Sequence, residues 1–295
     1  MRNRGRVWGI GLMLALFLVG MVPAIPAQAQ LVSSRKQSNA AGEAEVLNLL
    51  LIGQDKREEE KVNRSDSIIL CSFHPKTKQL LMTSILRDLY VPIPGYRKNR
   101  INAAYAYGGA PLLKKTLEQN LDISIDGCIE VDFDGFAKIL DLLGGVTLEL
   151  RQDEAELINR KTGSNLSEGT RTLNGQQALV YSRIRSLDLD GDFSRTDRQR
   201  KVLQAVWDHY KSSNLPTLVR VMGNLIPLLR TDMKSGELLG AVVDIFPALS
   251  EITIVSHRIP QSGRCTDRIV DGMAVLVADL DAERKDLHGK IYGGA

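Results

Sequence analysis

The sequence predicts a layered α/β domain or a mixed α/β/α domain. Strand-like runs follow one another closely after residue 46, and helical segments then alternate with further strand-like runs. The 295 residues are 43% apolar and 25% charged, which is ordinary for one sizeable globular core. Because no internal repeat and no second-domain boundary is evident, we expect residues 46–295 to form a single domain.

The N-terminal residues 1–29 have the order of an export signal. Three arginines precede an almost uninterrupted apolar run from Val7 to Val22, and residues 27–29 fit the small-x-small pattern that signal peptidase cuts. Both a cleaved signal and a retained signal anchor are compatible with this length. The polar and small residues at 30–45 predict a flexible tether. We therefore expect a protein on the extracytoplasmic face of the cell membrane, anchored or secreted.

The first half of the domain is expected to build most of the sheet. Alternation and β-branched content predict the strands, and a proline near the start with glycines at the end predicts the helices. The expected strands are Val46–Ile52, Ser67–Phe73, Gln79–Ile85, Cys128–Phe133 and Val146–Leu150, and the expected helices are Pro111–Asn120 and Gly135–Leu143.

The second half is expected to be mostly helical, because its apolar residues recur at helical spacing. The expected helices are Asn174–Tyr181, Ser194–Tyr210, Leu215–Leu229 and Ser235–Phe246, and Glu251–Ser256 is expected as the final strand.

Charge and motifs exclude several classes of function. A net charge of +3 is too small for a general nucleic-acid binder. The sequence lacks the P-loop, the G-x-S-x-G elbow and the H-E-x-x-H zinc motif. No C-x-x-C pair is present, which disfavours a zinc or thioredoxin-type site. Cys71 and Cys128 lie in strand-like runs, so we expect buried small hydrophobes, with a Cys71–Cys128 disulfide as the alternative.

Carboxylates lie at the ends of two neighbouring expected strands. Asp55 follows the first strand, and Asp66 directly precedes the second. Two converging carboxylates commonly hold Mg²⁺ beside substrate phosphates, so both residues are metal-ligand candidates. The alternative is that they are ordinary turn or capping residues. The third strand ends at Arg87 and Asp88, where the arginine either clamps a phosphate or forms a surface ion pair.

A second segment is rich in arginine rather than lysine, and guanidinium groups match phosphate oxygens well. Arg183 and Arg185 precede an acidic run, and Arg195 and Gln199 share one face at the start of the helix Ser194–Tyr210. Arg198 and Arg200 are expected off that face, and a solvated charged helix is the alternative for the whole cluster. The run Asp188–Asp192 fails the EF-hand pattern, so we expect an exposed loop there.

These ordered segments resemble the LytR-CpsA-Psr family. The resemblance covers about residues 46–186 and 194–201 and is weaker in the C-terminal third. The matching motifs are Asn48 to Asp55, Arg64 to Ile68, Leu86 to Asp88, Arg100 to Tyr105, Leu173 to Leu179, Tyr181 to Arg185 and Asp197 to Arg200.

The resemblance implies an α/β/α sandwich around a mixed sheet, with an apolar groove for a polyprenyl chain. It implies a Mg²⁺-dependent phosphotransferase that moves a glycopolymer from polyprenyl pyrophosphate to a peptidoglycan hydroxyl. The acceptor hydroxyl would be deprotonated by Asp88 or Asp66, and both are open at this point. The residue roles that it implies are Asp55 and Asp66 for the metal, Arg87, Asp88 and Asp66 for catalysis, and Arg64, Arg87, Arg183, Arg185, Arg195 and Gln199 for pyrophosphate.

Two other functions fit the same residues. A lipid-linked pyrophosphate hydrolase would use water in place of the sugar hydroxyl. A non-catalytic envelope protein would bind anionic polymer or lipid through its arginines.

Overall fold

The computed structural model describes residues 46–55, 64–189 and 191–293. The expected export signal at 1–29 and tether at 30–45 lie outside these residues. In the part of the chain that is described, no helix is both long and apolar enough to cross a bilayer.

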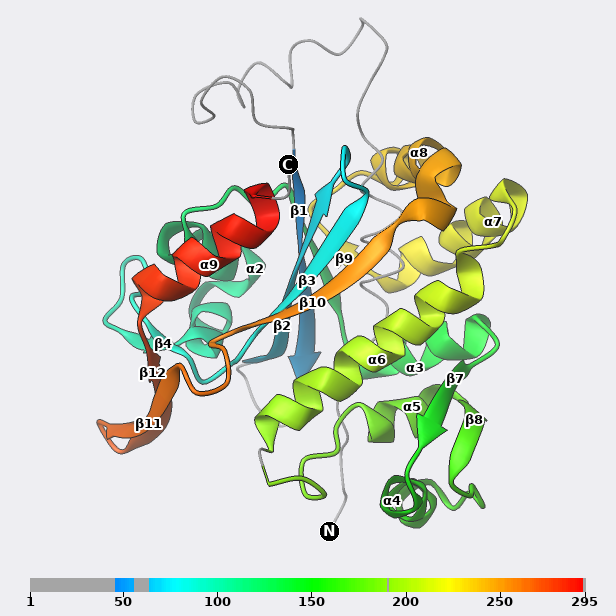
Figure 1. The fold of residues 1–295 in the computed structure, drawn as a ribbon, viewed down its shortest axis with the longest axis horizontal. Helices are drawn as coiled ribbons and strands as arrows, with labels where there is room; N and C mark the ends of the chain where they lie inside the picture. Colours follow the sequence, from blue (N-terminus) through cyan, green and yellow to red (C-terminus); the bar gives the residue numbers. More distant parts are fainter. Residues whose placement is uncertain (1–45, 56–63, 190, 294–295) are drawn as a thin grey trace, which may run out of the picture.

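A mixed six-stranded sheet forms the centre of the fold, with strand order β10-β3-β2-β1-β6-β9 (Figure 1). Strands β1, β2 and β3 are antiparallel neighbours, whereas β6 runs parallel to β1 and β10 runs parallel to β3. The sheet therefore confirms the expected mixed topology. Its strands are β1 (Leu47–Asp55), β2 (Arg64–His74), β3 (Gln79–Ile85), β6 (Gly127–Val131), β9 (Arg230–Thr231) and β10 (Thr253–Ile259).

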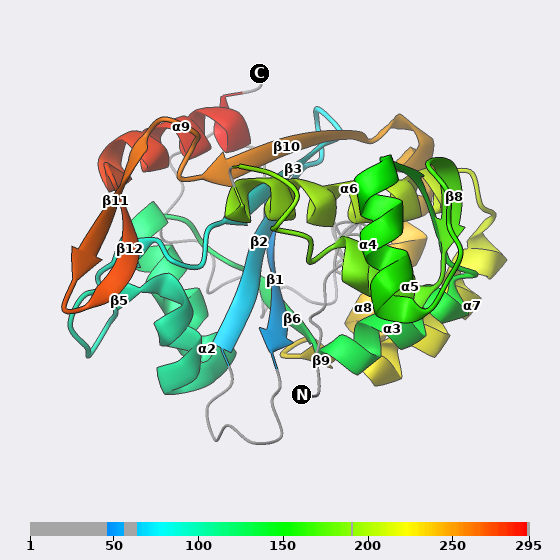
Figure 2. The same cartoon turned by 90° about the horizontal axis from the view of Figure 1, so that it is seen from below.

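Helices cover both faces of this sheet, as Figure 2 shows edge-on. Successive residues of β1 point to opposite faces, so Leu49 and Leu51 enter one core while Leu50 and Ile52 enter the other. The first core lies under α3 (Phe133–Leu142), α4 (Gln152–Thr162), α5 (Gly175–Tyr181), α6 (Asp192–Tyr210), α7 (Leu215–Leu225) and α8 (Ser235–Ile245), and the second under α2 (Ile101–Leu121) and α9 (Leu280–Tyr292).

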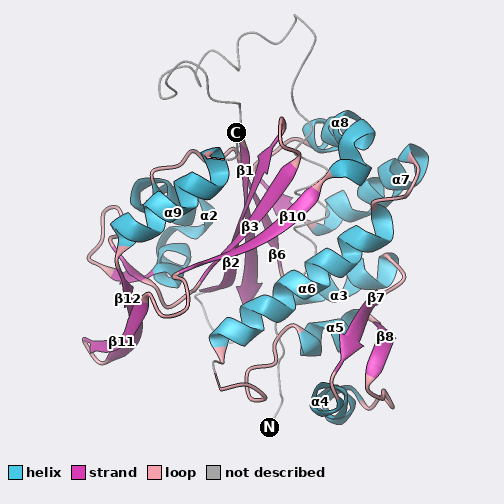
Figure 3. Cartoon of the chain, viewed as in Figure 1, coloured by secondary structure: helices cyan, strands magenta, loops and turns pink. Residues whose placement is uncertain are grey.

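Smaller elements surround the sandwich (Figure 3). Helix α2 is interrupted at Gly108 and Gly109, where the backbone leaves helical geometry, so the expected helix from Pro111 is only its second half. The remaining elements are β4 (Tyr90–Val91), β5 (Asn99–Arg100), β7 (Val146–Leu150), β8 (Gly169–Leu173), β11 (Cys265–Val270), β12 (Met273–Ala278), η2 (Ile226–Leu228) and η3 (Phe246–Glu251).

The expectation that the chain ends with the strand Glu251–Ser256 is wrong. That strand, β10, is Thr253–Ile259, and β11, β12 and α9 follow it. Strand β11 is largely exposed, and α9 buries few apolar side chains, chiefly Leu287 and Ile291. Both segments therefore lack the apolar periodicity from which the other elements were predicted.

The structure excludes the alternative of a Cys71–Cys128 disulfide. Cys71 pairs with Leu49 of β1 and Cys128 with Leu50, so the two thiols belong to cores on opposite faces of the sheet. Both are free and buried, and burial raises the pKa of the Cys128 thiol to about 12. They serve as small apolar core residues, as expected.

Candidate active site

A β-bulge positions Asp66 at the start of β2. Gly53 of β1 pairs with Ser67 of β2, and Gln54 pairs with Ser65, so Asp66 is the extra residue of the bulged strand. Bulges redirect a side chain out of the regular alternation of a strand. The carboxylate of Asp66 is only 5% exposed and reaches the end of the neighbouring β3.

Asp55 and Arg64 form the last backbone pair of β1 and β2. The prediction that Asp55 and Asp66 come together at adjacent strand ends is therefore confirmed for the backbone. The side chains of Asp55 and Arg64 lie outside the described residues, so their roles as metal ligand and pyrophosphate ligand stay predictions.

Arg87 follows β3 and forms an ion pair with Asp66. Its Nη1 lies 2.5 Å from Oδ1 of Asp66, and its Nε lies 3.4 Å from Oδ2 of Asp88. Burial opposes the charged form of Arg87, but the carboxylates of Asp66, Asp88 and Asp192 outweigh burial and raise its pKa. The guanidinium is therefore cationic and held between carboxylates at the edge of the sheet.

The first turns of α6 deliver Arg195 and Gln199 to the same place. Nη2 of Arg195 donates to the backbone oxygen of Asp66 at 3.3 Å, and Oε1 of Gln199 accepts from Oγ of Ser67 at 3.2 Å. Both side chains are buried, as a shared face against the sheet requires. Among the described residues, Nε of Arg195 and Nε2 of Gln199 find no hydrogen-bond acceptor, so two buried donors are left for a ligand.

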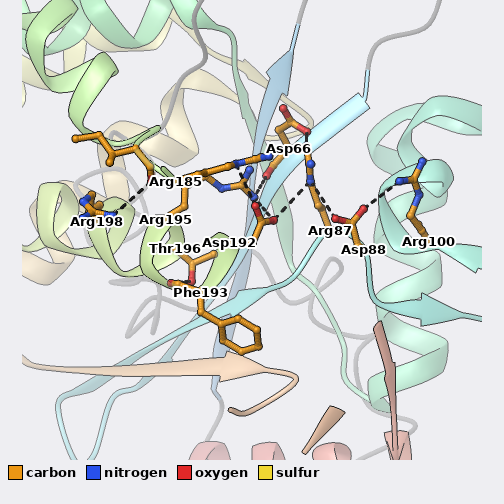
Figure 4. A network of polar contacts seen from close by, with 11 residues as sticks. Asp66, Arg87, Asp88, Arg100, Arg185, Asp192, Phe193, Arg195, Thr196 and Arg198 are labelled. Carbon is orange, nitrogen blue, oxygen red and sulfur yellow. Dashed lines mark hydrogen bonds and ion pairs between the residues drawn. The ribbon is translucent and has the colours of Figure 1, made fainter. Parts of the chain in front are cut away.

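Asp192 lies at the centre of the arginine cluster, which Figure 4 shows from close by. Its Oδ1 lies 3.0 Å from Nε of Arg185, and its Oδ2 lies 2.8 Å from Nη2 of Arg195 and 3.6 Å from Nε of Arg87. The pKa of Asp192 is raised overall. Burial and the neighbouring carboxylates of Asp88 and Asp66 raise it, and they outweigh Arg185 and Arg87, which lower it. Three guanidinium groups thus surround one anionic group.

The expectation of an exposed loop at Asp188–Asp192 is wrong for its two end residues. Asp192 begins α6, two residues before the expected helix start, and Asp188 pairs with Arg198 at 2.5 Å. Leu189 is fully exposed, so the middle of the run does face solvent. Asp192 also forms an ion pair with Arg195. The three-residue spacing of these two residues on a helix was the signal that could have identified their pair from the sequence.

The arginines expected off the shared face of α6 are also buried in ion pairs. Arg198 contacts Glu154 at 2.8 Å, and Arg200 pairs with Asp197 and donates to Oγ of Ser84 at 2.5 Å. The alternative of a solvated charged helix is therefore wrong at this end of α6. The guanidinium of Arg183 lies 5.6 Å from the centroid of the Phe133 ring, and its role in pyrophosphate binding stays a prediction.

A divalent metal fits this site through one or two carboxylates rather than a full protein cage. Within residues 46–55, 64–189 and 191–293, no three His, Cys, Asp or Glu side chains form a group able to hold a metal ion. Mg²⁺ typically takes one or two carboxylates and completes its shell with water and substrate phosphates. The oxygen ligands at this strand edge, with Asp66 the described one, are of the kind that Mg²⁺ prefers.

The comparison with protein families identifies the chain. The model of the LytR_cpsA_psr family matches residues 23–286. The chain belongs to this family. The family assignment agrees with the motifs at Asp66, Arg87, Arg185 and Gln199, which the fold brings together.

Relatives of the chain include two proteins with a transferase name and one with a regulatory name. The chain is 35% identical over 221 residues to the polyisoprenyl-teichoic acid–peptidoglycan teichoic acid transferase TagU of Oceanobacillus iheyensis, a match that spans 72% of this chain and 66% of that protein. The TagU protein of Bacillus licheniformis is 32% identical over 244 residues, spanning 81% and 77%. The regulatory protein MsrR of Staphylococcus aureus is 40% identical over 162 residues, spanning 54% of this chain and 48% of MsrR.

Solved structures of the family share the fold. TagT bound to LIIa-WTA is 31% identical, with a TM-score of 0.68 over 84% of this chain and 91% of TagT. A LytR-CPS2A-psr family protein, YwtF (TagT), with bound octaprenyl pyrophosphate lipid is 27% identical, with a TM-score of 0.65 over 87% and 95%. Both matches include most of the sandwich described here.

Proposed function

We propose that the protein transfers a glycopolymer from a polyprenyl-pyrophosphate carrier to a peptidoglycan hydroxyl outside the cytoplasm. The acceptor oxygen forms a bond to the phosphorus that bears the glycopolymer. The phosphoanhydride bond breaks, and polyprenyl phosphate leaves. The proton of the acceptor hydroxyl passes to a carboxylate, so the product is a phosphodiester between polymer and peptidoglycan.

The convergence of Arg87, Arg185 and Arg195 on one position carries this proposal. Phosphoryl transfer needs positioning and neutralisation of negative charge more than covalent participation by the protein. Three guanidinium groups within 3.6 Å of the Asp192 carboxylate define a position suited to an anion. Two buried donors without an acceptor among the described residues are available to phosphate oxygens. Nε of Arg195 would donate a charged hydrogen bond, and Nε2 of Gln199 would donate a neutral one.

The named relatives support the substrate class. Two TagU proteins are described as teichoic acid transferases acting between a polyisoprenyl carrier and peptidoglycan. The TagT structures hold LIIa-WTA in one case and octaprenyl pyrophosphate in another. These ligands support both a lipid-linked glycopolymer as donor and the apolar groove expected for its prenyl chain.

We assign the metal role to Asp66 together with Asp55. Mg²⁺ bound there would supply positive charge to the pyrophosphate oxygens and stabilise the leaving phosphate. Asp66 itself fixes Arg87 through the 2.5 Å ion pair and so orients one phosphate-binding donor. Removal of divalent metal is therefore expected to lower transfer without unfolding the domain.

Asp88 is better suited than Asp66 to accept the hydroxyl proton. The side chain of Asp88 is 25% exposed, whereas that of Asp66 is 5% exposed. Arg100 lies 3.3 Å from Oδ1 of Asp88 and holds that carboxylate beside Arg87. An incoming hydroxyl can reach the more exposed carboxylate, which is the geometric requirement for a general base.

The test is transfer of a lipid-linked glycopolymer to a peptidoglycan oligosaccharide by purified protein. Arg87→Ala and Asp66→Ala should each reduce the rate by about 100-fold or more. The first change removes a cation at the phosphate position, and the second removes the proposed metal ligand and the partner that fixes Arg87. Exposed Lys211 at the far end of α6 provides the control variant Lys211→Ala, which should retain the wild-type rate.

Two outcomes would contradict the proposal. If either active-site variant transfers polymer at the wild-type rate, the assigned site is wrong. If free polymer is released at equal rates with and without the oligosaccharide, the protein is a hydrolase. Tight polymer binding with no Mg²⁺-dependent turnover would indicate a non-catalytic envelope protein.

A further inference from the structure

A polar cavity of about 390 Å³ lies beside the arginine cluster, on another side of α6. The end of β7, the start of α4, Asp188 and the first turns of α6 line it. The volume falls within the range of small-ligand sites in proteins. The transfer mechanism above uses none of the residues that line it.

Buried ion pairs fix the inner wall of this cavity. Arg198 and Glu154 are each about 95% buried at the side chain and lie 2.8 Å apart. Asp188 joins them, with Oδ2 2.5 Å from Arg198 and Oδ1 3.0 Å from Arg151. Because each charged group is held by a partner of opposite sign, the wall presents fixed donors and acceptors rather than a free net charge.

The composition of the lining selects the chemistry of the ligand. A phosphate would meet more carboxylates than cations, and a prenyl chain would desolvate charged groups. No cluster among the described residues has the ligands for a metal ion. Alternating carboxylates and guanidinium groups instead match vicinal hydroxyls, which both donate and accept. The cationic lining residues are Arg151, Arg198 and Lys201, and the anionic ones are Glu149, Glu154, Asp188 and Asp197.

Helix α6 connects this cavity to the pyrophosphate position. Arg195 and Gln199 face the sheet edge, whereas Arg198 and Lys201 face the cavity. Residues three apart on a helix are neighbours nearly one turn apart, and their side chains differ in direction by about 60°. A ligand in the cavity is therefore a short distance from a phosphate held by Arg195.

We infer that the cavity binds a sugar ring of a glycan substrate while the arginine cluster holds the pyrophosphate. This inference rests on the proposed function, because that function supplies two glycans. The sugar belongs either to the lipid-linked glycopolymer or to the peptidoglycan acceptor. Its hydroxyl groups donate to Glu149 and accept from Lys201 at the outer rim of the cavity.

Lys201 is exposed, so substitutions there test the cavity without breaking the buried ion pairs. Lys201→Trp fills the outer part of the cavity, and Lys201→Ala removes one donor. Equilibrium binding is measured for three ligands: lipid-linked glycopolymer, peptidoglycan oligosaccharide and sugar-free octaprenyl pyrophosphate. Lys211→Ala, a lysine change on the same helix outside the cavity lining, is the matched control.

Lys201→Trp should weaken binding of one sugar-bearing ligand about tenfold and Lys201→Ala about threefold, with octaprenyl pyrophosphate unaffected. The sugar-bearing ligand whose binding weakens identifies the source of the sugar. Equal loss for all three ligands, or no loss for any, would overturn the inference. Binding is measured without turnover, so a protein that binds sugar but transfers nothing would contradict the proposed function alone.

Discussion

Nε of Arg185 lies 3.0 Å from Oδ1 of Asp192, and this pair places a carboxylate where a substrate phosphate would complete the arginine cluster. The segment that contains Arg185 and the first turn of α6 are connected through this contact and through the adjacent pair of Arg195 with Asp192. A phosphate that enters the cluster must share these guanidinium groups with Asp192. The carboxylate therefore both preorganises the arginines and competes with the ligand.

Neutralising Asp192 should tighten binding of pyrophosphate. Asp192→Asn keeps the shape of the side chain and removes a negative charge beside the ligand position, so the dissociation constant for inorganic pyrophosphate in EDTA should fall about tenfold. Calorimetric titration measures it. Asp208→Asn, an exposed change on the same helix, should leave binding as it is. Weaker binding by Asp192→Asn would mean that Asp192 supports the ligand rather than competing with it.

Replacing Gln199 should weaken lipid pyrophosphate binding without unfolding the domain. Gln199→Leu removes the buried Nε2 donor that has no acceptor, and binding of octaprenyl pyrophosphate should weaken about fivefold. The change also deprives Ser67 of its acceptor, so Ser67→Ala with Gln199→Leu should recover the thermal midpoint and keep the binding loss. Gln204→Leu on an exposed part of α6 is the control. Wild-type affinity in Gln199→Leu would show that the donor does not meet the ligand.

The buried pair of Arg198 and Glu154 should be strongly coupled in stability. Glu154→Ala leaves a buried guanidinium short of one partner and should cost about 3 kcal/mol of unfolding free energy. Glu154→Met combined with Arg198→Leu removes both charges and should recover most of that loss. Urea denaturation measures all the variants. If the double variant is as unstable as the sum of its two single variants, the pair is not coupled.

The domain should lose stability in mild acid through His257. Burial lowers the pKa of His257 to about 4, whereas an unfolded histidine has a pKa of 6.5. Between these two pH values the unfolded chain binds a proton at this residue and the folded chain does not. The free energy of unfolding therefore decreases as the pH is lowered from 6.5 to 4, by about 3 kcal/mol in all.

Urea denaturation at pH 7 and at pH 4 measures the His257 contribution. His257→Gln should remove most of the loss between the two pH values, because the unfolded chain then has one fewer proton to bind at that position. His209→Asn, at the end of α6, should retain the loss. An acid dependence in His257→Gln equal to that of the wild-type protein would contradict this prediction.

The sequence was sufficient to predict the elements that carry strong periodicity. Strands β3 and β7 have the expected bounds, and α5 and α8 are within one residue of them. Helix α4 and strands β8 and β11 were not predicted, because their apolar residues are few or are exposed. Strand β12 was also missed, although all of its residues are apolar. In such elements tertiary contacts rather than local pattern determine the conformation.

The site was predictable where a charged residue adjoins a clear strand end or helix start. Asp66, Arg87 and Gln199 met these conditions and lie in the site. The contact of Asp192 with Arg185 was not predictable, because it depends on the tertiary fold that brings Arg185 beside α6. No local spacing encodes that contact, whereas the spacing of Arg195 and Gln199 on one helix does encode their shared face.

Helix α6 also fixes the angle about its axis between two sets of side chains. Arg195 and Gln199 face the sheet edge, and Arg198 and Lys201 face the cavity. Each residue advances a helix by about 100°, so one inserted residue between Arg195 and Lys201 would swing the later side chains to a different side. Arg195 could then remain beside Asp66 while Lys201 left the cavity, or the reverse. The number of residues between Arg195 and Lys201 is therefore constrained, because an insertion or deletion there would separate one of the two side chains from its contacts.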